Sequence, residues 1–271
     1  MVGNIMNHGI CLLSVAGLRA EPDHRSELVS QLVFGDLFEV LENQKDWLQI
    51  RMLYDHYLGW VSANQVHLVS ESDFADLQGS PAAVSTDLIQ LIEDRTNNTS
   101  FAIGAGSSFY YYDMGSLSIA GKVYKYNGSV AREFPMKPAQ LAENALMFLN
   151  APYLWGGRSP LGVDCSGFMQ LVFKMGGIKI PRDAAVQATQ GETIHLINEA
   201  MPGDLLFFDN AEQQITHVGM LINDGHIIHA HGRVRIDLVD HNGIFNRDIR
   251  RYTHALRLIK RIRPSQVNTL S

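Results

Sequence analysis

The stretch Asp164-Cys165-Ser166-Gly167-Phe168 decides the fold of the C-terminal half of the chain. Asp is a favoured helix N-cap, and apolar residues follow it at helical spacing until Gly176-Gly177, where a helix typically ends. The stretch therefore predicts a helix over residues 164–175 with Cys165 in its first turn. Backbone N–H groups in a first turn lack helical partners, and the helix dipole favours negative charge. We therefore expect a lowered pKa for the Cys165 thiol and hydrogen-bond donors for an oxyanion.

A cysteine nucleophile needs a base, and two predicted strands carry four candidates, His217, His226, His229 and His231. The loop at residues 223–225, Asn-Asp-Gly, joins these strands. A two-residue Asp-Gly turn puts His217 and His229 on opposite faces of the sheet. A three-residue loop puts His217 opposite His231, with His229 beside it on the same face. A Cys-His-His site therefore requires the odd-length loop, and strand parity leaves His229 and His231 both open as its third member.

The residues around these motifs predict helices followed by antiparallel strands, which is the α+β pattern. Pro138 begins a predicted helix with apolar residues at helical spacing, and Pro152 stops it. Predicted strands follow at residues 204–208, 217–222, 226–231 and 255–262.

Residues 9–69 contain short strand-like segments separated by turns, a spacing that predicts a small β-barrel. Within them, the apolar run at residues 9–18 predicts one buried strand. The serine-rich residues 70–85 predict a linker, and residues 86–134 predict further strands with weaker signals. We therefore expect three parts, at residues 1–70, 71–135 and 136–271, the middle one being either a second barrel or a strand-rich linker domain.

The composition argues against several kinds of protein. The 271 residues are 46% hydrophobic and 18% charged, as in ordinary globular chains. The net charge of −6 argues against a nucleic-acid-binding protein, which usually carries a basic stripe. No stretch reaches the roughly 18 apolar residues of a membrane-spanning helix, so we expect no membrane partner. We also expect a monomer.

The apolar run at residues 9–18 superficially suggests a signal peptide, but no Lys or Arg precedes it and Arg19 and Glu21 follow closely. We therefore expect a cytoplasmic protein, with a periplasmic or secreted location as the alternative if a leader has been removed. A disulfide between Cys11 and Cys165 is not expected in the cytosol. Zinc is disfavoured because the catalytic half has one cysteine and no His-Glu-x-x-His helix, and we expect neither metal nor cofactor.

Three motifs resemble those of the NlpC/P60 cysteine peptidases: Asp164-Cys165-Ser166-Gly167-Phe168, His217-Val218-Gly219-Met220 and Ile228-His229-Ala230. They occur in the family's order within residues of about 138 to 262. The resemblance implies a papain-like catalytic domain in which Cys165 is the nucleophile, His217 is the general base and His229 orients that base. It also implies that the hydroxyl of Tyr153 helps to stabilise the oxyanion.

Two N-terminal segments, Leu18-Arg19-Ala20-Glu21-Pro22 and Asp55-His56-Tyr57-Leu58-Gly59-Trp60, resemble bacterial SH3-like (SH3b) domains. They are most similar to those fused to NlpC/P60 domains in YkfC-like γ-D-glutamyl-L-diamino acid endopeptidases. In that subfamily the SH3b domain narrows one end of the cleft, and the substrates are murein peptides with a free N-terminal L-alanine. The resemblance implies that the amine is bound by Glu21, Tyr57 and Asp183, and that Trp155, Asp164 and Ser166 also bind substrate.

One position departs from the subfamily: Ala184 stands where it often has Ser, which weakens any polar contact there. The function that the resemblance implies is hydrolysis of the γ-D-glutamyl-diamino acid bond of recycled murein peptides. Two alternatives stay open. The fold is also used by N-acetylmuramoyl-L-alanine amidases, acyltransferases and other wall hydrolases, and a non-catalytic module would bind wall peptides without cutting them. The intact Cys165, His217 and His229 argue against the non-catalytic module.

Overall fold

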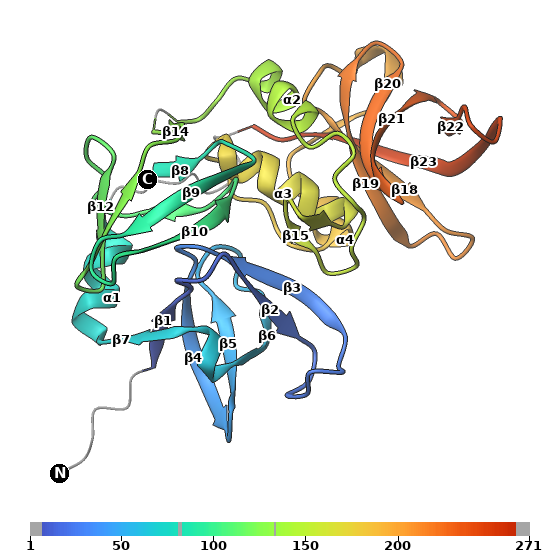
Figure 1. Ribbon diagram of the computed structural model, residues 1–271. Helices are drawn as coiled ribbons and strands as arrows, with labels where there is room; N and C mark the ends of the chain where they lie inside the picture. The colour runs from blue at the N-terminus through green and yellow to red at the C-terminus, as the bar shows by residue number, and fades with distance from the viewer. Residues whose placement is uncertain (1–6, 81–82, 133, 264–271) are drawn as a thin grey trace. The chain divides into compact units, whose positions relative to one another are not determined.

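The computed structural model describes residues 7–80, 83–132 and 134–263 (Figure 1). Contacts within the chain divide it into two compact units, with the boundary between residues 132 and 133. Among the described residues, strands outnumber helices in both units.

The first unit begins with the small barrel that the spacing of its short strands predicts, and this prediction is confirmed. Its sheet follows the order β3-β2-β6-β5-β4-β1-β7. Side chains on alternate strand positions, among them Leu18, Leu32 and Ile50, are fully buried in its core together with Cys11. The strands are β1 (His8–Ile10), β2 (Val15–Arg19), β3 (Leu28–Val33), β4 (Leu37–Gln44), β5 (Trp47–Met52), β6 (Leu58–Ser62) and β7 (His67–Val69).

The apolar run at residues 9–18 forms two strands, β1 and β2, rather than the single strand predicted. In the break between them, the N–H of Cys11 donates to the carbonyl of Asp36 at 2.9 Å. The N–H of Gly35 donates to the carbonyl of Cys11 at 2.8 Å. These two hydrogen bonds to the β3–β4 turn satisfy the backbone N–H and carbonyl of Cys11, which lies between the strands. The side chains of the run are nevertheless mostly apolar. The hydrophobicity of the sequence therefore does not predict the break between β1 and β2.

The serine-rich segment predicted as a linker contains a helix, α1 (Glu71–Gly79). Ser70 is its N-cap, and the Ser70 hydroxyl accepts the N–H of Asp73 at 3.1 Å. Phe74 and Leu77, three residues apart, are buried in the core of the same unit. The linker prediction is wrong over these residues, because a serine that favours loops is here the cap of a helix.

Residues 83–131 form two further antiparallel sheets, ordered β10-β9-β13-β12 and β11-β8-β14. Their buried side chains, including Ile92 and Tyr124, share one hydrophobic cluster with Ile10, Phe34 and Leu37 of the preceding segment. This segment therefore packs with the barrel in one unit, and its assignment as a second SH3b-like domain stays a prediction. The strands are β8 (Ala83–Ser85), β9 (Ile89–Asp94), β10 (Thr99–Gly104), β11 (Ser108–Phe109), β12 (Ser116–Ile119), β13 (Lys122–Tyr126) and β14 (Val130–Ala131).

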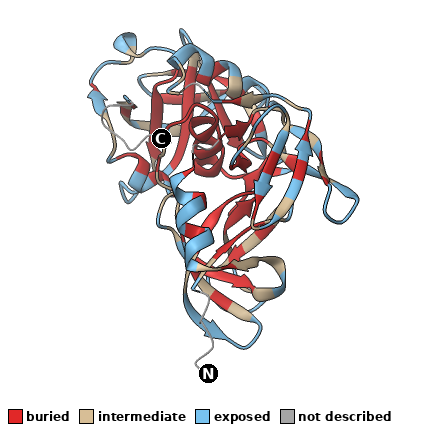
Figure 2. Ribbon diagram, turned by 90° about the vertical axis from the view of Figure 1, so that its left-hand side faces the viewer, coloured by how far each residue is buried: buried red, intermediate tan, exposed pale blue. Residues whose placement is uncertain are grey.

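The second unit packs helices on an antiparallel sheet, which confirms the predicted α+β class. The sheet order is β17-β23-β18-β19-β20-β21-β22, and β22 also pairs with β23, so strands β18 to β23 form a closed ring of neighbours. Helix α3 is buried along its whole length (Figure 2) and packs against β19 and β20. The elements are α2 (Pro138–Leu146), β15 (Arg158–Ser159), β16 (Gly162–Val163), α3 (Cys165–Met175), α4 (Ala184–Gln187), β17 (Glu192–Ile194), β18 (Leu205–Asp209), β19 (Ile215–Asn223), β20 (His226–His231), β21 (Arg233–Asp240), β22 (Gly243–Asn246) and β23 (Arg251–Arg261), with a 3₁₀ turn η2 (Ile197–Glu199).

The predicted helix at residues 164–175 is α3, and the four predicted strands are β18, β19, β20 and β23. Strands β17, β21 and β22 have no counterpart in the predicted set. The sequence of β21, Arg-Val-Arg-Ile-Asp-Leu-Val-Asp, alternates polar and apolar residues, which is the pattern of a half-buried strand. A signal for β21 is therefore present in the sequence.

Leu206→Ala is expected to lower the free energy of unfolding by about 2–5 kcal/mol, because it deletes buried methyl groups and leaves a cavity. Leu206 lies on β18, is fully buried and packs in one cluster with Phe208, Leu221 and Ile227. Urea unfolding of the full chain, followed by circular dichroism, measures the change. Leu196→Ala is the matched control, since Leu196 is 56% exposed. Equal losses in the two variants would contradict the prediction.

Candidate active site

The predicted nucleophile lies at the start of α3. Asp164 caps the helix in an extended backbone conformation, and its Oδ1 accepts the N–H of Gly167 at 2.7 Å. Cys165 is the first helical residue and is only 7% exposed. A side chain at Gly167 is excluded because its Cβ would lie 2.3 Å from the carbonyl oxygen of Gly157. The Asp-Cys-Ser-Gly motif therefore combines a helix cap, a buried thiol and a close approach of two backbone segments.

Residues of the second unit donate hydrogen bonds to both carboxylate oxygens of Asp164. The buried Arg182 donates to both of its oxygens, from Nη2 to Oδ2 at 2.6 Å and from Nη1 to Oδ1 at 2.9 Å. Gly156 N–H donates to Oδ2 at 3.0 Å, and Ser166 Oγ donates to Oδ1 at 3.3 Å. With the N–H of Gly167, these donors fill the roughly four lone-pair positions of a carboxylate. The structure thus gives Asp164 a structural role, and the contacts of Asp164 and Ser166 with substrate stay predictions.

The register between β19 and β20 decides which histidines meet. Strand pairing skips Ile222, which forms a β-bulge, and the turn that follows is the two-residue Asp224-Gly225. The register before the bulge places His217 and His229 on one face of the sheet. The predicted need for a three-residue loop is therefore wrong, because the bulge supplies the odd residue inside the strand.

His217 and His229 are both buried and hydrogen bonded to each other, with 2.8 Å between His217 Nε2 and His229 Nδ1. The N–H of Val218 hydrogen bonds to the sulfur of Cys165, which brings the thiol next to the strand residue that follows His217. Gly219 pairs with His229, and a Cβ at Gly219 would lie 2.8 Å from the Cβ of His229. The glycine of the His-Val-Gly motif therefore makes room for the second histidine.

His229, and not His231, forms the hydrogen bond with His217. His231 is exposed, and its ring centroid lies 6.5 Å from that of His217, against 5.1 Å for His229. The geometry therefore favours His229 as the third member of the site, which strand parity left open. His229 Nε2 in turn lies 3.0 Å from Oδ2 of Asp237, a residue of β21 that was absent from the predicted site. The alternating pattern of β21, next to the histidine strand, is the signal that points to it.

His254 on β23 also belongs to this cluster and was absent from the predicted site. Its ring stacks on that of His217, with 4.3 Å between the centroids and 27° between the planes. Its Nδ1 lies 2.9 Å from Thr253 Oγ1. Strand β18, which pairs with both β19 and β23, brings the two histidines together. Because this is a long-range contact with no local motif, sequence spacing gives no signal for it.

Burial is the largest influence on the pKa of Cys165, the candidate nucleophile. It raises the pKa of the Cys165 thiol to about 11, and the charge of Asp164 acts in the same direction. The N–H groups of Val218 and Ser166 act against this rise. The expected lowering of this pKa is therefore wrong for the free protein, because the desolvation of a buried thiolate outweighs the favourable helix start.

The histidine pair is also kept neutral. Burial holds the pKa of His217 well below its usual value of 6.5, and the neighbouring His229, His254 and His231 lower it further. Burial likewise lowers the pKa of His229, although its hydrogen bond to Asp237 opposes this. Burial therefore favours the neutral thiol of Cys165 and the neutral imidazoles of His217 and His229 in the free protein.

Three other predicted residues of the second unit lie on loops or at an element start. Burial raises the pKa of Tyr153 to about 12, and the charges of Cys165 and Asp164 add to the rise, so the hydroxyl stays protonated. Trp155 is 63% exposed. Asp183 is exposed at the N-cap of α4, directly after the buried Arg182. The roles of Tyr153, Trp155 and Asp183 toward substrate stay predictions.

Glu21 and Tyr57 belong to the first unit. Glu21 is exposed after β2, and its N–H donates to Ser26 Oγ at 2.9 Å. Tyr57 is half-buried against the barrel core, and its N–H donates to Asp55 Oδ1 at 3.0 Å. The predicted binding of a substrate amine by these two residues stays a prediction.

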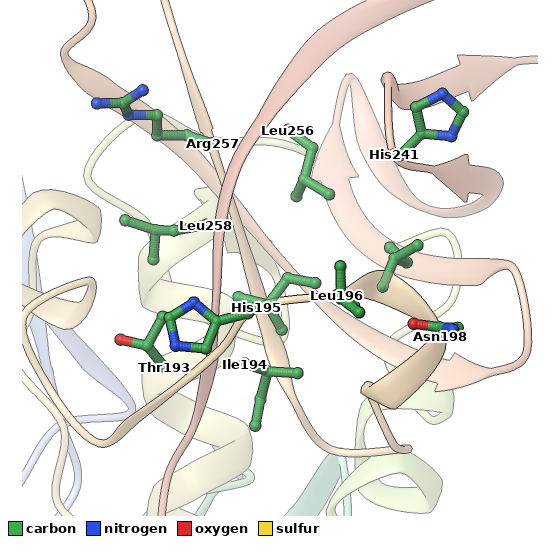
Figure 3. A pocket seen from close by; sticks show the side chains of 11 residues that line it. Thr193, Ile194, His195, Leu196, Asn198, His241, Leu256, Arg257 and Leu258 are labelled. Carbon is green, nitrogen blue, oxygen red and sulfur yellow. The ribbon is translucent and has the colours of Figure 1, made fainter.

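A separate surface pocket of about 350 Å³ lies between β23 and the segment at residues 193–198 of the second unit (Figure 3). Of the described residues that line it, none belongs to the predicted site. Within residues 7–80, 83–132 and 134–263, no group of three or more His, Cys, Asp and Glu side chains is arranged to hold a metal ion. In the same ranges, no helix has the length and hydropathy to cross a membrane.

Comparison with known families agrees with this geometry. The NlpC/P60 family matches residues 150–253, and the bacterial dipeptidyl-peptidase Sh3 domain matches residues 18–66. The chain contains an NlpC/P60 domain preceded by a bacterial SH3 domain. The NlpC/P60 match includes α3 and the β19–β20 pair, which carry the candidate nucleophile and base. The protein is therefore a cysteine peptidase with an N-terminal SH3b domain.

Two relatives and one solved structure are similar to most of the chain. Dipeptidyl-peptidase 6 of Lysinibacillus sphaericus is 29% identical over 82% of this chain and 87% of its own length. The gamma-D-glutamyl-L-lysine dipeptidyl-peptidase of Bacillus cereus is 27% identical over 76% of this chain and 68% of its own. The crystal structure of an NlpC/P60 family protein from Bacillus cereus covers 94% of this chain and 99% of that one, with a TM-score of 0.80 at 22% identity. These two structures share one fold.

Gly219→Ala is expected to lower kcat of the peptidase by about 10²-fold, because the new methyl group displaces His229 from its hydrogen bond with His217. Steady-state kinetics on a murein peptide measure the loss, and circular dichroism checks the fold. Gly79→Ala is the matched control, since a Cβ at Gly79 meets nothing within 4 Å. A Gly219→Ala enzyme as fast as this control would contradict the prediction.

Lowering the pH from 7 to 5 is expected to destabilise the protein. The pKa values of His217, His229 and His254 are all lowered in the folded state, that of His254 to about 4. Below pH 6.5 the histidines of the unfolded chain therefore bind protons, whereas His217, His229 and His254 of the folded protein stay neutral. Their contribution to the free energy of unfolding is present above pH 6.5 and is lost as the pH falls.

The free energy of unfolding is expected to fall by up to about 1.4 kcal/mol per pH unit for each proton that the unfolded chain binds and the folded protein does not. Urea unfolding at a series of pH values measures this change. The variant His254→Gln removes one of the three groups and is expected to reduce the slope of stability against pH. A slope identical to that of the wild type would show that His254 does not contribute.

Proposed function

We propose that this cysteine peptidase hydrolyses the amide bond between γ-D-glutamate and a diamino acid in murein peptides that have a free N-terminal L-alanine. The observation that carries the proposal is the buried, hydrogen-bonded pair of His217 and His229 beside the Cys165 thiol at the start of α3. The specificity is supported by relatives named gamma-D-glutamyl-L-lysine dipeptidyl-peptidase, of which that of Bacillus subtilis is 44% identical over 33% of this chain.

The reaction begins when the sulfur of Cys165 attacks the carbonyl carbon of the γ-glutamyl amide and the thiol proton passes to His217. Because His217 Nε2 is engaged with His229, Nδ1 is the nitrogen that takes this proton. Backbone N–H groups at the start of α3 and the hydroxyl of Tyr153 stabilise the oxyanion. His217 then protonates the amine of the leaving diamino acid, and water hydrolyses the thioester to release the dipeptide.

The N-terminal ammonium group of the substrate is proposed to bind to Glu21, Tyr57 and Asp183. Carboxylates and a hydroxyl suit this group, because an ammonium leaving water needs opposite charge and hydrogen-bond acceptors. The exposed ring of Trp155 offers a large apolar surface to the peptide. A requirement for the free amine restricts the enzyme to wall fragments whose L-alanine has already been released from sugar.

Such fragments are products of murein turnover, and we propose that the enzyme acts on them in the cytoplasm during recycling. The proposal of a cytoplasmic location is separate from that of the cleaved bond. Fractionation of cells that make the protein tests it, and recovery of the chain outside the cytoplasm would contradict it.

The cleavage is tested with the tripeptide L-Ala-γ-D-Glu-meso-diaminopimelate. Wild type is expected to release L-Ala-γ-D-Glu and free diaminopimelate, identified by mass spectrometry, and Cys165→Ala is expected to release neither. The control substrate is the same tripeptide with its amine acetylated, which is expected to stay intact.

Each other result points to a different function. Cleavage of the acetylated and free tripeptides at equal rates would refute the free-amine site at Glu21, Tyr57 and Asp183. Release of L-alanine from N-acetylmuramic acid would indicate an amidase. Binding of wall peptides without any cleavage would indicate a non-catalytic module.

A further inference from the structure

A buried carboxylate lies behind the histidine pair. Asp237 on β21 is 2% exposed, and its Oδ2 is 3.0 Å from His229 Nε2. Arg235 forms an ion pair with the same oxygen, with 2.7 Å from Nε to Oδ2, and its Nη2 donates to Oδ1 at 2.8 Å. That Nη2 also donates to Oδ2 of Asp248 at 2.9 Å, so a second carboxylate holds the guanidinium in place. A continuous series of polar contacts therefore runs from His217 through His229 and Asp237 to Arg235.

We propose that Asp237 is a positioning residue that sets the tautomers of both histidines and thereby makes His217 a base toward Cys165. The inference rests on the proposed roles of Cys165 as nucleophile and His217 as base. Asp237 itself touches neither the sulfur nor the substrate, and it acts through His229.

The hydrogen-bond geometry leaves one arrangement of protons. An ionised carboxylate only accepts hydrogen bonds, so His229 must carry its proton on Nε2, facing Asp237. His229 Nδ1 then holds a lone pair, and its 2.8 Å contact requires His217 Nε2 to be the donor. A neutral imidazole has a single N–H, which leaves the lone pair of His217 on Nδ1. This is the nitrogen that the thiol proton must reach.

Arg235 prevents the opposite arrangement of protons, in which a protonated Asp237 would donate a hydrogen bond to His229. A guanidinium has only donors, so the hydrogen bond from Arg235 Nη2 requires Oδ1 of Asp237 to remain an acceptor, and the positive charge beside Oδ2 favours the ionised carboxylate. Burial raises the pKa of Asp237, but the hydrogen bonds from His229 and Arg235 outweigh it and hold the pKa at about 2. Asp237 is therefore ionised at neutral pH, and its carboxylate oxygens remain hydrogen-bond acceptors.

The variant Asp237→Asn separates this role from simple packing, because it keeps the size of the side chain and changes one acceptor into a donor. Arg235 will hold the amide oxygen, so the amide NH₂ will face His229 Nε2 and both histidines will reverse their tautomers. His217 Nδ1 then carries a proton and cannot accept one from Cys165. We expect kcat on L-Ala-γ-D-Glu-meso-diaminopimelate to fall by about 10²- to 10⁴-fold with little change in KM, as when a carboxylate that orients a catalytic histidine becomes an amide.

The matched control is Asp240→Asn, on the same strand. Its carboxylate accepts the hydroxyl of Tyr252 at 2.5 Å and has no contact with the histidine cluster among the hydrogen bonds of the described residues. We expect kcat and the histidine tautomers of this variant to match those of the wild type. If Asp237→Asn also keeps kcat within twofold of wild type, the proposal is wrong.

Nitrogen NMR of the imidazole rings tests the tautomers directly, without relying on catalysis. In the wild type, two-bond ¹H–¹⁵N spectra are expected to show His217 and His229 both protonated on Nε2, with assignments from His217→Gln and His229→Gln. In Asp237→Asn both are expected to be protonated on Nδ1. A wild-type His229 protonated on Nδ1 would overturn the proposal, even if every variant at residue 237 failed to fold or the tripeptide proved not to be the substrate.

A double-mutant cycle with His229→Ala decides whether Asp237 acts through His229. If it does, Asp237→Asn will cause no further fall in kcat once His229 is absent, because the two residues form one unit. A merely structural carboxylate would lower kcat by the same factor in both backgrounds, and that additive result would refute the positioning role.

Discussion

The hydrogen bond between His217 and His229 depends on a single bulged residue, Ile222. With a two-residue turn and no bulge, the two rings would lie on opposite faces of the sheet, and one of them would be lost to the site. The extra residue at the bulge shifts the strand pairing by one position, so that both rings lie on the same face of the sheet while the turn keeps two residues. The same register also places Gly219 opposite His229, so that the missing side chain of one strand accommodates the ring of the next.

Cys165, the proposed nucleophile, is held in place by a different interaction. Helix α3 is buried throughout, so its start cannot rely on solvent to satisfy the cap. A buried ion pair costs desolvation free energy unless its geometry fills the remaining lone pairs. The two-point contact between Asp164 and Arg182, completed by two backbone N–H groups and Ser166, meets that condition. Asp164 thereby joins the loop before α3 to the segment after it, and Cys165 is fixed between them.

Sequence motifs predicted the elements that are local, and missed those that depend on distant strands. The helix around Cys165 follows from its cap, its apolar spacing and its terminal glycines, and His217 and His229 follow from motifs on adjacent strands. The bulge at Ile222 has no signature, because an isoleucine fits a regular strand equally well. His254 enters the site only through the pairing of β23 with β18, about which spacing says nothing. The sign of the Cys165 pKa shift was also wrong, because helix position is readable from sequence whereas the degree of burial is not.

The burial of the histidine pair is the reason that the tautomer of His217 matters. Because the site is desolvated, the neutral forms of the Cys165 thiol and of His217 are favoured, so these two side chains do not form a thiolate–imidazolium pair in the free protein. A neutral imidazole is a base at only one nitrogen, and which nitrogen that is depends on its hydrogen-bond partner. A buried site therefore needs an anchor whose proton state does not change, and the ionised Asp237 beside Arg235 meets this need. In the proposed reaction, His217 takes up the thiol proton and becomes positively charged beside the neutral ring of His229. Asp237, which contacts His229, is then proposed to supply the negative charge that stabilises the protonated His217.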